Sequence, residues 1–157
     1  MESGLEDLFA EFNLNMLYGR FNHSLDSKGR VIIPVRFRDS LGSPVVVTRG
    51  YDINCLCIFS KDEFIKRMTK LREIPASDEQ GQKFIRYFLG NAEPCIPDKQ
   101  GKILIPAHLR EDVGLDKELV LSGMGDRVEV WSREVWEASS SYQSTEEISA
   151  SVEKYNI

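Results

Sequence analysis

The sequence lacks a long apolar run, and it has only two histidines and three cysteines. A membrane-spanning helix needs about 20 consecutive apolar residues, and the first residues lack the basic start and apolar centre of a signal peptide. We therefore expect a cytoplasmic protein without a membrane anchor. The cysteines (Cys55, Cys57 and Cys95) are odd in number and lack Cys-x-x-Cys spacing, which favours reduced thiols in the core or at an interface.

Sequence motifs typical of enzyme active sites are also missing. There is no glycine-rich nucleotide loop and no nucleophile elbow, and His23 and His108 are not spaced as metal ligands. We expect no enzyme activity, no cofactor, no metal and no small-molecule substrate.

The charge balance argues at first against a nucleic-acid partner. The 157 residues carry a net charge of −5, whereas nucleic-acid-binding domains usually have a basic surface. The charge is uneven, however, because residues 16–40 hold five basic side chains against two acidic ones. A local basic patch is therefore compatible with an acidic chain.

One pattern occurs twice, 72 residues apart. Asp26-Ser-Lys-Gly-Arg-Val-Ile-Ile-Pro34 returns as Asp98-Lys-Gln-Gly-Lys-Ile-Leu-Ile-Pro106, and Arg38 returns as Arg110. Two copies at a fixed offset indicate a duplicated structural unit. Units of this size would be marginal alone, so we expect them to share one core.

The pattern predicts a mainly β protein with helices after each repeat, an α+β fold. Each copy predicts a strand, an Asp-to-Gly turn, a β-branched strand ended by proline, a short helix and two further strands. Capping boxes at Ser60–Glu63 and Ser77–Gln80 predict two helices between the copies. The predicted organisation begins with an N-terminal extension (1–15), which forms either a short amphipathic helix or an accessory segment. A first repeat (16–64), connecting helices (65–90), a second repeat (91–137) and a mobile tail (138–157) follow.

The turns carry the candidate binding chemistry. Asp26 and Asp98 can accept backbone N–H groups, and Gly29 and Gly101 supply the positive φ that such a turn requires. The side chain after each glycine, Arg30 or Lys102, then projects from a fixed strand start. A positioned arginine can bind a phosphate or the edge of a guanine.

Other basic side chains support this prediction to different degrees. Lys28 adds a charge at the tip of the first turn, and Arg36 is a candidate phosphate contact because the second copy lacks it. Arg38 and Arg110 are repeated, which favours a structural role, each paired with an acid in its own half. The alternative for a single turn is an ordinary hairpin tip with solvated charges, and the repeat favours binding over it.

These residues resemble the MraZ family of bacterial transcriptional regulators, within the AbrB/SpoVT-like swapped-hairpin group. Leu25–Pro34 with Phe37-Arg38 and Asp98–Pro106 with Leu109-Arg110 carry the resemblance, supported by Phe88–Ala92 and Val128–Trp131. The resemblance covers roughly residues 16–137. Two features differ from the family: Lys102 stands where an arginine is usual, and members commonly begin near the counterpart of Met16.

The resemblance implies a pseudo-twofold double swapped-hairpin β-barrel in each chain and a ring of chains associated with the nucleoid. It implies binding to double-stranded DNA at tandem G-rich boxes in the promoter of the division and cell-wall gene cluster, including its own gene, most often as a repressor. The DNA-binding residues would be Lys28, Arg30, Lys102 and Arg36, with Asp26, Gly29, Asp98 and Gly101 positioning them. The alternative is an oligomeric scaffold with the same barrel and little specific DNA binding.

Overall fold

The computed structural model describes residues 17–139 and 144–157, and the helix expected within residues 1–15 lies outside them. All strand pairs are antiparallel. The strands are β1 (Arg20–Ser24), β2 (Arg30–Ile32), β3 (Val45–Arg49), β4 (Leu56–Ser60), β5 (Glu93–Cys95), β6 (Lys102–Leu104), β7 (Glu118–Gly123) and β8 (Val128–Ser132). The helices are α2 (Val35–Leu41), α3 (Lys61–Leu71), α4 (Glu79–Phe88), α5 (Ala107–Asp112), α6 (Arg133–Ser139) and α7 (Thr145–Tyr155). The expected α+β class is confirmed.

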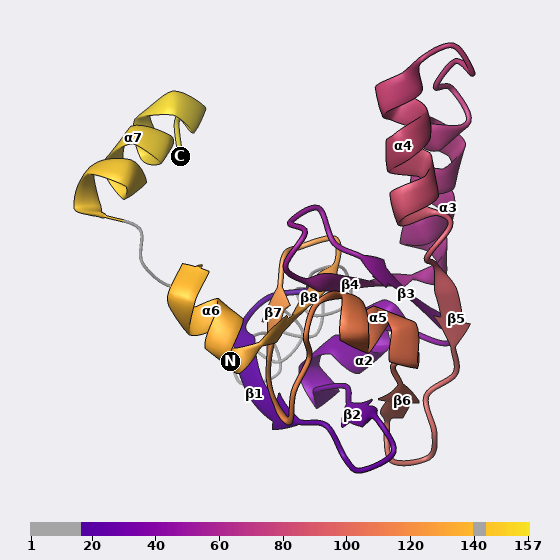
Figure 1. Ribbon diagram of the computed structural model, residues 1–157. Helices are drawn as coiled ribbons and strands as arrows, with labels where there is room; N and C mark the ends of the chain where they lie inside the picture. The colour runs from indigo at the N-terminus through magenta and orange to yellow at the C-terminus, as the bar shows by residue number, and fades with distance from the viewer. Residues whose placement is uncertain (1–16, 140–143) are drawn as a thin grey trace, which may run out of the picture.

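The duplication governs the order of the strands. Moving β2 and β4 forward by 72 residues gives the bounds of β6 and β8. The six-stranded sheet has the order β1-β7-β8-β4-β3-β5, which is symmetric about the β8–β4 pair. The first strand of each repeat thus joins strands of the other repeat, and β2 and β6 form a separate two-stranded sheet (Figure 1).

A shared core joins the two sheets. Val31 and Ile103 of the small sheet are buried with Ile58 and Val130 of the large one, and Phe37 and Leu109 from the short helices α2 and α5 belong to the same cluster. Because both repeats contribute equivalent side chains to one cluster, neither can bury its apolar face without the other.

The other face of the large sheet is covered by helices. Phe59 of β4 packs with Phe64 of α3 and Phe88 of α4, and Trp131 of β8 packs with Trp136 of α6. Helices α3 and α4 form a hairpin that rises from the sheet (Figure 1). Within the described ranges, no helix has the length and apolar character needed to cross a bilayer.

The helix starts agree with the predicted capping in one case of two. Ser60 accepts the N–H of Glu63 at 3.1 Å and caps α3 as expected. The cap of α4 is Asp78, which accepts the N–H of Gly81 at 3.0 Å, so the box predicted at Ser77 was wrong by one residue. Within the expected tail, α7 is helical and residues 144–157 are all exposed; the mobility of this segment stays a prediction.

Candidate nucleic-acid interface

The first turn is built around the carboxylate of Asp26. Its Oδ1 accepts the backbone N–H groups of Lys28 and Arg30, both at 2.9 Å, while the N–H of Gly29 donates to the Asp26 carbonyl at 3.0 Å. Gly29 has a φ of +82°, a conformation that few other residues adopt without strain. The turn therefore fixes the direction in which β2 and Arg30 leave it.

The second turn repeats this geometry. Asp98 Oδ1 accepts the N–H groups of Gln100 and Lys102, both at 2.9 Å, and the N–H of Gly101 donates to the Asp98 carbonyl at 2.9 Å. Gly101 has a φ of +80°. The hydrogen bonds are the same although the residues between the aspartate and the glycine differ, so the aspartate and the glycine determine the turn.

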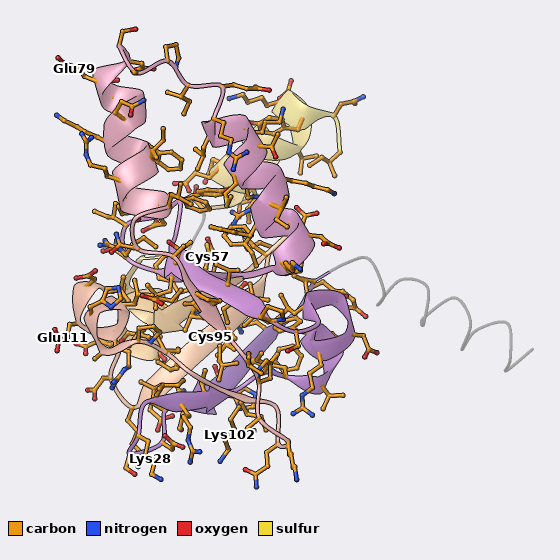
Figure 2. The ribbon with its side chains drawn as sticks, turned by 90° about the vertical axis from the view of Figure 1, so that its right-hand side faces the viewer. Lys28, Cys57, Glu79, Cys95, Lys102 and Glu111 are labelled. Atoms are coloured by element: carbon orange, nitrogen blue, oxygen red, sulfur yellow. The ribbon has the colours of Figure 1, made fainter. Side chains whose placement is uncertain are left out.

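The β2–β6 pairing places the two turns side by side. Ile33 donates its N–H to the carbonyl of Gly101 at 2.8 Å, and Ile105 donates to the carbonyl of Gly29 at 3.1 Å. Arg30 Nη1 lies 3.9 Å from Asp98 Oδ2 of the other turn. Figure 2 shows Lys28 and Lys102 at the same end of the molecule, far from α3 and α4. The repeats thus present one surface, which we call the double-turn surface and define as residues 26–30 and 98–102.

Arg38 braces the turn of the other repeat. Its Nε donates to the carbonyl of Ile33 at 2.9 Å and its Nη2 to the carbonyl of Gln100 at 3.2 Å. A Cβ at Gly101 would come within 2.6 Å of its guanidinium carbon, so the arginine occupies the space beside the glycine.

Arg110 occupies the equivalent space beside the first turn. Its Nε donates to the carbonyl of Ile105 at 3.0 Å, and its guanidinium carbon lies 2.5 Å from where a Cβ at Gly29 would stand. The predicted structural role agrees with this geometry. Each Nε–H donates to a backbone carbonyl and not to the predicted acid in the same half.

The electrostatics of the first turn hold Arg30 in place. The backbone N–H of Arg30 is the largest of several causes that lower the pKa of Asp26 to about 2. At neutral pH the anionic Asp26 accepts the Nε–H of Arg30 at 2.8 Å, and the terminal amino groups remain as further donors. The pKa of Asp98 is also lowered, mainly by the backbone N–H of Lys102.

The lysines give the double-turn surface its net charge. Lys28 and Lys99 are exposed and Lys102 is half-buried. With Arg30, these four cations face two aspartates, so the surface is cationic on a chain whose net charge is −5. Sequence reasoning missed Lys99, although its place directly after Asp98 at a turn tip could have pointed to it.

Arg36 lies elsewhere. Its guanidinium carbon is 4.7 Å from the ring centre of Tyr18 and 5.3 Å from that of Phe21, near the start of β1, whereas the turn follows the end of that strand. The structure therefore brings Lys28, Arg30 and Lys102 together on one surface and does not bring Arg36 to it. A DNA contact by Arg36 stays a prediction.

A buried polar cluster lies at the centre of the six-stranded sheet, where β4 and β8 pair and where the sequence predicted only core or interface thiols. Cys57 pairs across β4–β8 with Glu129, its equivalent in the second repeat. The Sγ atoms of Cys55 and Cys57 and a carboxylate oxygen of Glu129 lie within 4.8 Å of one another. Glu129 Oε1 accepts the indole N–H of Trp131 at 3.1 Å. The Cys55 thiol donates to the carbonyl of Asp52 at 3.5 Å. The interaction between the two thiols lowers the pKa of Cys57 and raises that of Cys55.

Comparison with known proteins agrees with the repeated architecture. The model of the family described as "MraZ protein, putative antitoxin-like" matches residues 16–86 and 88–155. "Transcriptional regulator MraZ" of Caldanaerobacter subterraneus subsp. tengcongensis is 46% identical over 144 residues, which cover 90% of this chain and 100% of that protein. "Transcriptional regulator MraZ" of Acetivibrio thermocellus is 45% identical over 135 residues, or 86% of this chain and 92% of that protein.

The fold and the double-turn surface together define a tandem-repeat α+β protein that presents a cationic pair of turns. The family-model match and the identity to the relatives then show which family the chain belongs to. The chain belongs to the MraZ family, and both of these relatives are named as transcriptional regulators. The resemblance inferred from the doubled motif is thereby confirmed.

Proposed function

We propose that the protein is a sequence-specific, DNA-binding transcriptional regulator. It acts as a repressor of the division and cell-wall gene cluster, including its own promoter, in the cytoplasm at the nucleoid. The observation that carries the proposal is the double-turn surface, where Lys28 and Lys102 lie at one end of the molecule (Figure 2). Arg30 and Lys99 belong to the same two turns. Family membership supports it, because the relatives are named as regulators.

The roles of the side chains follow from their chemistry. Arg30 is held through its Nε by Asp26, so its terminal amino groups can fork onto a guanine edge with little loss of conformational freedom. Lys28, Lys99 and Lys102 are point charges suited to phosphate. The second turn therefore contributes affinity and register, and the first turn contributes base reading.

An oligomer offsets the weak charge of a single subunit. One ring carries several double-turn surfaces, and each can bind one of a series of tandem G-rich boxes. The ring then gains affinity through effective concentration. We propose such a ring, built from chains that each form a double swapped-hairpin barrel. The symmetric strand order, in which β1 joins β7 and β5 joins β3, supports the exchange of hairpins between the repeats.

One alternative function has an observation in its favour. Arg30 lies 2.8 Å from Asp26 and 3.9 Å from Asp98, so both aspartates offset its charge, and Lys102 cannot fork onto a base. An oligomeric scaffold with little specific DNA binding would tolerate this pairing. The two functions differ in whether Arg30 affects binding to a specific duplex.

The test is fluorescence anisotropy with a labelled duplex from the region upstream of the protein's own gene, and a scrambled duplex. Wild type is compared with Arg30→Ala and with Arg133→Ala, a matched control whose side chain also pairs at i and i+4, with Glu137 at 3.2 Å. We expect Arg30→Ala to lose about 1–3 kcal/mol of discrimination between the duplexes, and Arg133→Ala to lose none. Equal weak binding to both duplexes in all three proteins would favour the scaffold.

A further inference from the structure

Two apolar surfaces on this chain have complementary charge: a groove beside the α3–α4 hairpin and one face of α7. We propose that α7 of one copy docks in the α3–α4 groove of a second copy. The inference rests on the proposed oligomer and identifies the contact that would link its subunits. The contact does not depend on DNA, so the docking of α7 and the proposed DNA binding can be refuted separately.

The groove has an aromatic floor and a basic rim. Its volume is about 450 Å³, and its floor includes Tyr51, Phe84 and Phe88. The ring centres of Tyr51 and Phe84 lie 6.5 Å apart, and these side chains are 46% and 36% exposed. Lys66 and Lys70 of α3 line the same groove. A partly exposed aromatic cluster rimmed by charge is typical of a helix-binding groove.

Helix α7 has the corresponding apolar stripe. Ile148, Val152 and Tyr155 recur at i, i+4 and i+7, which places them on one face, and they are 49%, 44% and 64% exposed. Figure 1 shows α7 standing clear of the other elements. A helix of 11 residues is marginal in water without a packing partner, so its stability calls for a surface that covers this stripe.

Charge indicates that the α3–α4 groove is the surface that covers the apolar stripe of α7. The first turn of α7 carries Glu146 and Glu147, and the helix holds three glutamates against one lysine. The groove presents Lys66 and Lys70 beside its aromatic floor, so an acidic helix is attracted and a basic one is repelled. The family match extends through residue 155, so α7 belongs to the part of the chain shared with the family.

The contact would join different surfaces on the two copies. Such a heterologous contact links subunits head to tail, and it gives a ring when the rotation between neighbours closes. The α7–groove contact is therefore of the kind that the proposed ring requires, whereas an isologous contact would stop at a dimer.

The test is the mass of the full-length protein without DNA, measured by sedimentation velocity over a range of concentrations. In the double variant Ile148→Ser/Val152→Ser, we expect the assembly midpoint to move to about tenfold higher concentration or more, from the usual value of burying aliphatic side chains. The matched control Ala150→Ser lies on the opposite face of α7 and should leave the midpoint unchanged. Assembly of the double variant like wild type would overturn the docking site, while a monomeric wild type would overturn the oligomer as well.

Charge reversal tests which surface receives α7. Lys66→Glu/Lys70→Glu should weaken assembly, and adding Glu146→Lys/Glu147→Lys should restore it, because each reversed surface then faces its complement. Failure of this rescue would contradict the pairing. A photo-cross-linking residue at Tyr155 separates the remaining cases: covalent dimers joined to α3 or α4 support the proposal, whereas cross-links within one chain, or to other elements, would overturn it.

Discussion

The contact between Gly101 and Arg38 can be tested by adding one methyl group. In Gly101→Ala, the new Cβ would come within 2.6 Å of the guanidinium of Arg38, and the residue would still need a φ near +80°. Gly125→Ala is the matched control, because Gly125 also has a positive φ, of +88°, but nothing lies within 4 Å of its Cβ position. Both variants place an alanine at a similar positive φ, and only Gly101→Ala displaces the arginine.

The magnitudes follow from these contacts. A left-handed conformation costs an alanine about 1–2 kcal/mol, which is the expected loss for Gly125→Ala. Displacing Arg38 breaks its hydrogen bonds to the carbonyls of Ile33 and Gln100, and a bond from a charged donor contributes about 1.5–3 kcal/mol. Since the second bond is long and exposed, we expect Gly101→Ala to lose about 3–5 kcal/mol in total.

The assay is urea unfolding of wild type and both variants at one protein concentration, because assembly makes apparent stability depend on concentration. The free energies of unfolding are compared at equal m-values. The pair Gly29→Ala and Gly114→Ala repeats the experiment in the other half, since Gly29 faces Arg110 and Gly114 has nothing within 4 Å. Equal losses within each pair would refute the bracing role of the arginines.

Two further predictions concern single hydrogen bonds. The Asp26 carboxyl should titrate near pH 2 by carbon-13 NMR, so the stability that it provides is complete above its ordinary pKa of 3.8 and is lost as the pH falls through about 2; a midpoint near 3.8 would contradict the turn geometry. Thr48→Val should lower the free energy of unfolding by about 1–3 kcal/mol, because the buried hydroxyl donates to the Phe88 carbonyl at 2.5 Å and ties β3 to α4. Thr69→Val, which removes an exposed bond to the carbonyl of Ile65, is its control, and similar losses in both would show that burial is not what gives the bond its value.

The duplication and the local turn chemistry could be predicted from the sequence. The constant offset of 72 residues anticipated that β6 and β8 would repeat β2 and β4, because equivalent residues have equivalent local preferences. The Asp-to-Gly turns were predictable for the same reason, since their hydrogen bonds join residues at most four positions apart.

Contacts between the repeats could not be predicted in this way. Nothing in the sequence near Arg38 indicates that its partners include Gln100, 62 positions away, so a nearby acid seemed the natural partner. Likewise, Cys57 meets Glu129 only because β4 of the first repeat pairs with β8 of the second. The displaced cap of α4 has a local cause: Ser77 and Asp78 are both good N-caps, and the sequence pattern does not decide between neighbours.

The central claim is that the two turns form one DNA-binding surface. Its most direct test is the salt dependence of duplex binding by Lys28→Ala/Lys99→Ala, with Lys61→Ala/Lys83→Ala, which removes two exposed lysines of α3 and α4, as control. If the two turns form one surface, the slope of log affinity against log salt should be shallower by about 0.9 for each phosphate that the variant no longer neutralises. This should hold on both specific and scrambled duplexes. The control should keep the wild-type slope. A double-turn variant that also keeps the wild-type slope and affinity would contradict the account.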